Sequence, residues 1–165
     1  MTTIRPSTDG ADDTAHMRRC LALAAEAAAL GEVPVGALLV HDGVVVGEGC
    51  NRREIDGDPL AHAELRAIAQ AATRLSRWRL SGCTLYVTLE PCFMCAGALV
   101  NARVDRLVYG ALDAKAGAVA SLGAVCSDAR LNHRLSITGG VLEEECGAVL
   151  KSFFTTLRNR RGGEP

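Results

Sequence analysis

The chain has 165 residues, of which 48% are hydrophobic and 22% charged, and its formal net charge is −1. These values are typical of one globular domain that buries its own core, and they exclude a fibrous or low-complexity protein. The balanced charge gives no global support for nucleic-acid binding, although a local basic patch would suffice for it.

Neither the apolar runs nor the cysteines indicate a membrane or secreted protein. No run approaches the roughly 20 apolar residues that cross a bilayer, and the polar residues 1–15 lack a signal-peptide pattern. Seven cysteines, an odd number, fit a reducing compartment better than a disulfide framework. We therefore expect a cytoplasmic protein without membrane contacts, with packing cysteines at Cys20, Cys50, Cys83, Cys126 and Cys146.

The N-terminal part is expected to begin with a disordered leader at residues 1–12, which show no apolar periodicity. A helix is predicted from about residue 13 to Leu30, and Gly31 supplies its stop. Its buried stripe has apolar residues three or four apart: Met17, Leu21, Ala24 and Ala28. Two β-rich runs, 36–40 and 44–49, then flank a short turn and predict a β-hairpin.

The rest of the chain alternates helices and strands. In order, the predicted elements are a polar loop (50–59), a helix (62–73), a strand (84–89), a helix starting near Cys92, a strand (106–110), a long loop (111–131), a short strand (135–138) and a helix (141–157). The alternation predicts an α/β fold with three layers, α/β/α, around a central mixed sheet of about five strands. Residues 13–161 would form this single domain, and residues 162–165 a flexible tail.

Two short motifs carry the chemistry. His62-Ala63-Glu64 begins one predicted helix, and Pro91-Cys92-Phe93-Met94-Cys95 begins the next. His62, Cys92 and Cys95 are of the kinds that hold zinc, and three protein ligands leave a catalytic ion its fourth position for water. Glu64 is a nearby carboxylate that can move protons. The combined pattern matches the H-x-E…P-C-x-x-C signature of zinc nucleobase deaminases.

Each motif alone has other interpretations. An isolated H-x-E is usually chance, and an isolated C-x-x-C in an intracellular protein is equally a redox pair or part of a structural zinc site. A redox pair needs thiols that are free to form a disulfide. Pro91 before the cysteine pair and the His-Glu element upstream favour a metal site instead.

From about Glu32 to Phe154 the chain resembles the bacterial tRNA-specific adenosine deaminases, within the cytidine-deaminase-like superfamily. The matching segments are EVPVGALLV (32–40), GEGCNR (47–52), AHAEL (61–65), TLYVTLEPCFMCAGAL (84–99), DAKAGA (113–118), LNHR (131–134) and CGAVLKSFF (146–154). The zinc half is common to the superfamily. Leu89-Glu90 and the DAKAGA and LNHR segments resemble the tRNA branch.

The resemblance implies hydrolytic deamination of the wobble adenosine to inosine in a tRNA anticodon loop, by a homodimer with one zinc ion per chain. His62, Cys92 and Cys95 would hold the zinc, and Glu64 would be the catalytic acid and base. The family's nucleotide contacts carry over to Asn51, Asp113, Asn132 and Phe154, and His133 is a weaker candidate. Asn51 and Asn132 could instead cap turns, and Phe154 could be part of an ordinary helix core.

Two positions depart from the family pattern, Leu112 where Arg is expected and Ala116 where Thr is expected. Both lie in the loop expected to face RNA, so they bear on RNA preference rather than on the zinc chemistry. The basic residues near the C-terminus, Lys151, Arg158, Arg160 and Arg161, are interpreted either as phosphate contacts or as cations that suit a helix end. The alternative functions are a free nucleobase or nucleoside deaminase, for guanine, cytosine or cytidine, and a non-catalytic RNA-binding zinc subunit.

Overall fold

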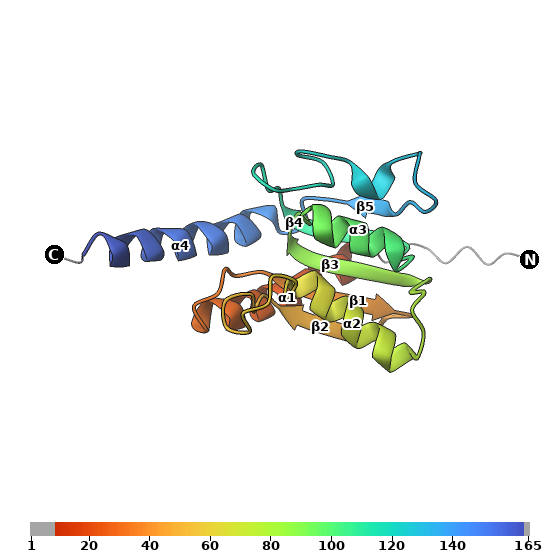
Figure 1. The fold of residues 1–165 in the computed structure, drawn as a ribbon, viewed down its shortest axis with the longest axis horizontal. Helices are drawn as coiled ribbons and strands as arrows, with labels where there is room; N and C mark the ends of the chain where they lie inside the picture. The colour runs from red at the N-terminus through yellow and green to blue at the C-terminus, as the bar shows by residue number, and fades with distance from the viewer. Residues whose placement is uncertain (1–8, 164–165) are drawn as a thin grey trace, which may run out of the picture.

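The computed structural model describes residues 9–163, with residues 9–11 described by backbone only. The elements are α1 (Asp9–Ala29), β1 (Gly36–His41), β2 (Val44–Cys50), α2 (Ala63–Leu75), β3 (Cys83–Leu89), α3 (Phe93–Asn101), β4 (Arg106–Ala111), the 3₁₀ helix η1 (Val125–Ser127), β5 (Ser136–Thr138) and α4 (Glu143–Arg161). Figure 1 shows their arrangement. None of the described helices is long and apolar enough to cross a membrane.

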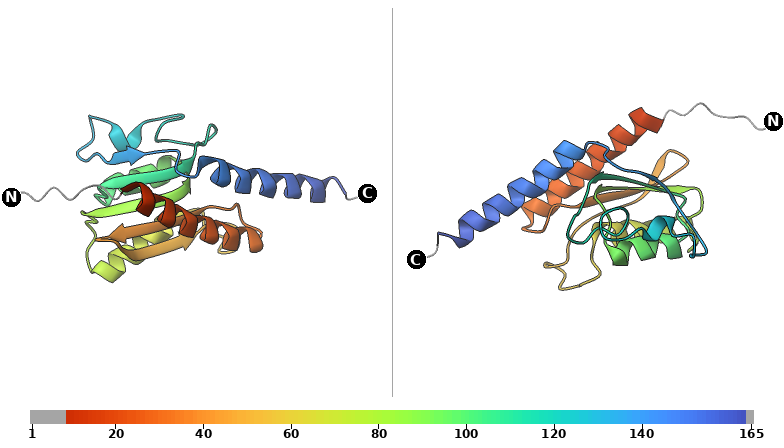
Figure 2. Two further views of the ribbon diagram at one scale, coloured as in Figure 1. Left: turned by 180° about the vertical axis from the view of Figure 1, so that it is seen from behind. Right: turned by 90° about the horizontal axis from the view of Figure 1, so that it is seen from above.

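The five strands form one mixed sheet in the order β2-β1-β3-β4-β5. Strand β1 pairs antiparallel with β2 and β3, whereas β3, β4 and β5 are parallel. Helices α1 and α4 cover one face of the sheet and α2 and α3 cover the other (Figure 2). The predicted three-layer α/β/α fold with a mixed sheet is therefore confirmed.

Alternating side chains of the strands pack in two apolar layers, one on each face of the sheet, because successive residues of a strand point to opposite faces. Leu39, Leu85 and Leu107 are fully buried in the cluster beneath α2 and α3. Their neighbours in the strands, which include Leu38 and Val108, pack in the second cluster beneath α1 and α4. A fully buried leucine contributes roughly 1.5–3 kcal/mol, so both helical layers are fixed to the sheet.

Glycines in β2 allow α2 to pack with backbone contact against the sheet. A Cβ at Gly47 would overlap the Ala67 carbonyl, and one at Gly49 would lie 2.7 Å from the Ala63 carbonyl oxygen. Any larger residue at either position would push α2 outwards. This close approach fixes the start of α2, and therefore the position of His62.

Several predicted boundaries were wrong. Helix α1 begins at Asp9, so part of the predicted leader is helical, while residues 1–8 lie outside the described residues. Helix α4 continues to Arg161, because its exposed arginines form the last turns of a helix that extends beyond the sheet (Figure 1). The predicted long loop contains the short helix η1 and an isolated bridge between Cys92 and Gly117. Four of the five packing cysteines are buried, and Cys50 is half-buried.

Candidate active site

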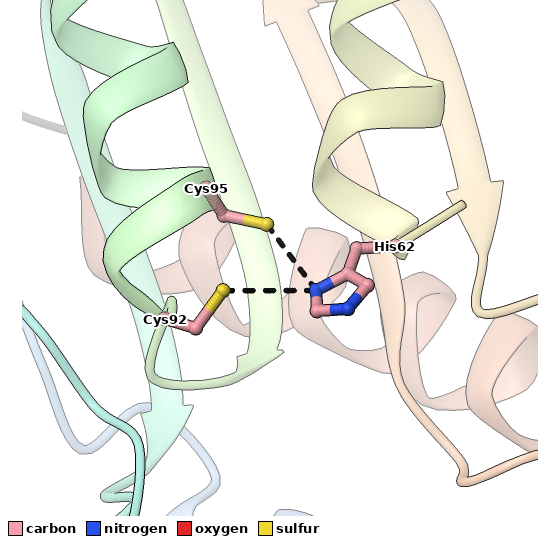
Figure 3. A group of neighbouring side chains, drawn as sticks. All are labelled: His62, Cys92 and Cys95. Atoms are coloured by element: carbon pink, nitrogen blue, oxygen red, sulfur yellow. Dashed lines mark hydrogen bonds between the residues drawn. The ribbon is translucent and has the colours of Figure 1, made fainter. Parts of the chain in front are cut away.

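Three potential metal ligands meet where α2 and α3 begin. His62 is the N-cap of α2 and Cys92 is the N-cap of α3, and neither side chain makes a capping hydrogen bond. Cys95 lies three residues after Cys92, and this spacing brings their side chains to the same side of the helix. Figure 3 shows both sulfur atoms directed at the His62 ring.

The distances within this group are short. His62 Nδ1 lies 3.7 Å from Cys92 Sγ and 3.5 Å from Cys95 Sγ. All three potential ligand atoms lie within 4.8 Å of one another. The sequence-predicted ligands are thus brought together from two elements about 30 residues apart, in a group that can hold a metal ion.

The electrostatics of the group favour a cation. A hydrogen bond from Cys95, and a second one with His62, lower the pKa of Cys92 to about 4. The hydrogen bond to Cys92, together with burial, raises the pKa of Cys95. Hydrogen bonding to Cys92 also raises the pKa of His62. Cys92 is thus the more acidic of the two thiols, and a bound cation would favour the thiolate form of both.

Glu64 lies in the first turn of α2, with 4% of its surface exposed. Burial is the largest influence on this carboxyl group and raises its pKa. Glu64 therefore lies beside the three potential ligands as a buried carboxyl group that holds its proton more tightly than an exposed one.

A pocket of about 210 Å³ opens onto these residues, and its lining includes Glu64, His62, Cys92, Asn51 and Asp113. The Asn51 side chain is fixed by two hydrogen bonds. Its Nδ2 donates to the Val33 carbonyl at 3.2 Å, and its Oδ1 accepts the Arg53 N–H at 3.1 Å. The lining also includes residues that sequence reasoning did not propose for the site: Val33, Val35, Arg53, Ala63, Leu89 and Glu90.

A groove of about 620 Å³ adjoins the pocket and shares residues Val33, Leu89, Asp113 and Ala116 with it. The remaining lining of the groove comes from the loop after β4 and from α4: Leu112, Ala114, Lys115, Leu150, Lys151, Phe154 and Arg158. The structure therefore places Phe154, and both residues that depart from the family pattern, beside the pocket.

Two of the predicted residues lie elsewhere. Asn132 is exposed in the bend after η1 and lines neither the pocket nor the groove. His133 Nε2 lies 2.7 Å from the Val104 carbonyl oxygen, a contact in which the ring N–H donates to the backbone. This contact supports a structural role for His133.

Glu90 organises one wall of the pocket, and no single motif indicated this. The residue is 2% exposed. Its Oε1 accepts backbone N–H groups from Val119, Ala120 and Ser121, at 3.3, 2.7 and 2.8 Å. Its Oε2 accepts the Asp113 N–H at 2.9 Å and the Ser121 hydroxyl at 2.6 Å. Burial would raise the pKa of Glu90, but these hydrogen bonds lower it below its ordinary value.

Glu32 is a second buried carboxylate, next to Val33 of the pocket lining. The residue is fully buried, and its Oε1 accepts the Ile55 N–H at 2.7 Å. This bond ties the loop that follows Asn51 to the turn after α1. In the sequence, Glu32 is visible only as a glutamate shortly before a β-rich run. Its hydrogen-bond partner could not be identified from sequence.

Comparisons with known proteins agree with this geometry. The family model of MafB19-like deaminases matches residues 11–158. A tRNA-specific adenosine deaminase of Bacillus subtilis is 45% identical, over 90% of this chain and 92% of its own. One of Haemophilus influenzae is 48% identical, over 90% and 87% of the two chains.

A solved structure from studies of A-to-I editing by tRNA:A34 deaminases superimposes with a TM-score of 0.80 at 43% identity. The match covers 83% of this chain and 99% of that one. Fold, site geometry and relatives therefore lead to one assignment. The chain belongs to the tRNA-specific adenosine deaminase family.

Proposed function

We propose that this protein hydrolytically deaminates the wobble adenosine of a tRNA anticodon to inosine, with release of ammonia. The observation that carries the proposal is the pocket that Glu64 shares with His62, Cys92, Asn51 and Asp113. The pocket, of about 210 Å³, is lined by apolar side chains and by a few polar groups, as in sites for small ligands. The base has to leave its stack to enter.

We propose zinc, one ion per chain, as the metal at His62, Cys92 and Cys95. With Zn–S about 2.3 Å and Zn–N about 2.0 Å, tetrahedral geometry separates sulfur from nitrogen by ~3.6 Å. The observed distances of His62 Nδ1 from the two sulfur atoms, 3.7 and 3.5 Å, support this ion. Zinc in such a three-ligand site lowers the pKa of a water molecule and so supplies the nucleophile.

In the proposed reaction Glu64 moves the protons. Its carboxylate takes a proton from the attacking water and gives it to the ring nitrogen beside the carbon that carries the amino group. The same group then takes the second proton from the new hydroxyl on that carbon and gives it to the amino group, so that the C–N bond breaks, ammonia leaves and the carbonyl of inosine forms. The buried position of Glu64 and its raised pKa support both roles.

The RNA around the target base would follow the adjoining groove. Lys115, Lys151 and Arg158 line this groove and suit phosphates, and Phe154, which is 41% exposed there, suits stacking on a neighbouring base. Asn51 and Asp113 would contact the target nucleoside. We also propose a contact for Asn132, although it lies outside both cavities, made with flanking nucleotides or across a homodimer.

A homodimer and a cytoplasmic location complete the proposal. Exposed apolar side chains near the site, Ile55, Leu60, Phe93 and Leu122, supply contact area for a second copy. All seven cysteines are free, which supports a reducing compartment. Light scattering at working concentration checks the oligomeric state, and a monomer there would contradict the dimer.

Inosine formation on a matched set of substrates tests the function. The set holds an anticodon stem-loop with wobble adenosine, the same loop with cytidine, and free adenosine, cytidine and guanine. We expect product only from the adenosine stem-loop. Turnover of a free base or nucleoside, with the stem-loop untouched, would instead make the protein a small-molecule deaminase. Full metal content without any turnover would favour the non-catalytic zinc subunit.

A further inference from the structure

An aromatic and arginine-rich surface lies at the end of the molecule opposite the pocket. Trp78, in the loop between α2 and β3, is 57% exposed. The Arg79 guanidinium carbon lies 4.7 Å from the centroid of the indole ring, and that of Arg103 lies 6.0 Å away. Arg74 and Arg77 precede Trp78 and are exposed. We call these five residues the Trp78 platform.

The platform is fixed relative to the pocket by two helices. Both α2 and α3 begin at the metal-ligand group and end beside the platform, at the right edge of Figure 1. Helix α2 has 13 residues, so it places the platform about 20 Å from His62 at 1.5 Å per residue. The platform therefore cannot contact the same nucleotide that enters the pocket, and a molecule bound at both places must reach across this distance.

The backbone of the platform is held firmly. Leu80 N–H donates to the Ala102 carbonyl at 2.7 Å, which joins the Trp78 loop to the end of α3. The Arg103 guanidinium donates to the Val100 carbonyl at 2.8 Å, and that of Arg77 donates to the Ser81 carbonyl at 3.0 Å. The indole ring is thus presented to solvent on a rigid support, and a partner that stacks on it would not need to order a loop.

The arginines of the platform lack ion-pair partners among the described residues. Among residues 9–163, none of its four arginines has a carboxylate within ion-pair distance, whereas Arg19, Arg52, Arg53, Arg66, Arg106 and Arg130 all do. Two nearby acids are engaged elsewhere: Asp105 accepts the Gly82 N–H at 2.7 Å, and Asp42 lies 3.6 Å from His41. Arg74, Arg77 and Arg103 each direct N–H groups at backbone carbonyls and keep further donors free.

We propose that the Trp78 platform is a second RNA-binding surface, which contacts the tRNA outside its anticodon stem-loop. Unpaired guanidinium groups are suited to phosphates, and an exposed indole between them is suited to an unstacked base. The choice of tRNA as the RNA rests on the proposed function. Trp and Arg also dominate protein–protein contacts, but two guanidinium groups over the indole ring, with two more exposed arginines just before Trp78, favour a polyanion.

The test is binding of two RNAs, measured by fluorescence anisotropy with the purified full-length protein. One RNA is a complete tRNA transcript with wobble adenosine, and the other is its excised anticodon stem-loop. For Trp78→Ala we expect about a tenfold rise in Kd for the complete tRNA, the scale of one lost base stack, and an unchanged Kd for the stem-loop. Trp78→Phe should restore most of the affinity.

Arg79→Gln is a second, independent test, because it removes one positive charge and leaves the Trp78 indole in place. Its plot of log K against log salt for the complete tRNA should be less steep by about 1, since roughly one phosphate contact is lost. Arg18→Gln, which removes an exposed arginine from α1, is the matched control and should leave the selectivity between the two RNAs unchanged.

Equal weakening of both RNAs by Trp78→Ala, or no change with either, would overturn the proposal. An unchanged Kd for both RNAs would instead favour a protein partner at this surface. A wild-type protein that fails to deaminate the stem-loop would overturn the proposed function alone, because the binding comparison does not depend on turnover.

Discussion

The Asp113 N–H donates to Glu90 Oε2 at 2.9 Å, across 23 residues of sequence. Glu90 lies two residues before the ligand Cys92, and Asp113 lines the pocket. One buried carboxylate thus joins the metal-ligand segment to the wall that receives the substrate. Gly117 shows how closely these parts fit, because any Cβ there would overlap the Glu90 carboxylate.

Glu90→Gln should separate substrate binding from metal binding. The new amide NH₂ would face backbone N–H groups that now donate to a carboxylate. We therefore expect the free energy of unfolding to fall by roughly 3 kcal/mol, the scale of one charge-assisted hydrogen bond. We also expect a raised KM for the stem-loop, because the pocket wall would shift. Metal content should persist. Thermal unfolding, kinetics and zinc analysis measure this. Glu54→Gln, in an exposed position, is the control, and an unchanged KM in Glu90→Gln would contradict the assigned role.

Glu64→Gln should abolish turnover while the metal stays bound. The amide keeps the size of the side chain but cannot shuttle protons, so we expect a fall in kcat of about 10³-fold. Inosine formation in single-turnover conditions and the zinc content per chain are the two measurements. Near-normal turnover would remove Glu64 from the mechanism, and so would the same result for Glu64→Ala.

Cys92→Ala should lose the metal and destabilise the protein. Two ligands remain, and we expect a Tm lower by roughly 10 °C, the shift that ~3 kcal/mol gives for a domain of this size. Cys50→Ala removes a half-buried thiol outside the site and should keep the metal. A full equivalent of zinc in purified Cys92→Ala would show that this ligand set is wrong.

Asp13→Asn should make the free energy of unfolding depend less on pH in the acid range. Burial raises the pKa of Asp13, but hydrogen bonds from Arg106 and Tyr86 more than offset this and hold it below its ordinary value. The folded carboxyl group therefore stabilises the protein above about pH 3.9, and this stability is lost as the pH falls through the folded pKa.

Urea unfolding at a series of pH values between neutral and acid measures this effect. The wild type should lose stability towards acid more steeply than Asp13→Asn. Asp12→Asn removes the exposed neighbouring carboxylate and should follow the wild type. Identical acid limbs in the wild type and Asp13→Asn would disprove the contribution.

The layered fold and the placing of Cys92 and Cys95 on one side of a helix start could be predicted from sequence, because both depend on local spacing. Residues three apart at a helix start lie on the same side in almost any fold, and apolar periodicity fixes which faces are buried. Helix α1 begins at Asp9, four residues before its predicted start, because residues 9–12 carry no apolar periodicity that would indicate a helix from sequence. The end of α4 was misjudged for the same reason.

The role of Glu90 was not predictable, since its partners lie in a loop that returns from about 30 residues further along the chain. That loop has no periodicity that would indicate its path. Asn132 shows the converse limit. It belongs to a segment that matches the family, yet it does not line the pocket of its own chain. Sequence similarity does not reveal what a side chain faces in the folded protein.

The two ligands at helix N-caps have a consequence for folding. His62 and Cys92 occupy positions where a side chain normally satisfies the first turn of its helix, and here neither does so. An ion held by both would join the first turns of α2 and α3 across a gap that no side-chain hydrogen bond of these caps spans. Metal uptake and the ordering of these two helices would then be one linked equilibrium, in which a chelator acts as a denaturant whose strength depends on the free-ion concentration.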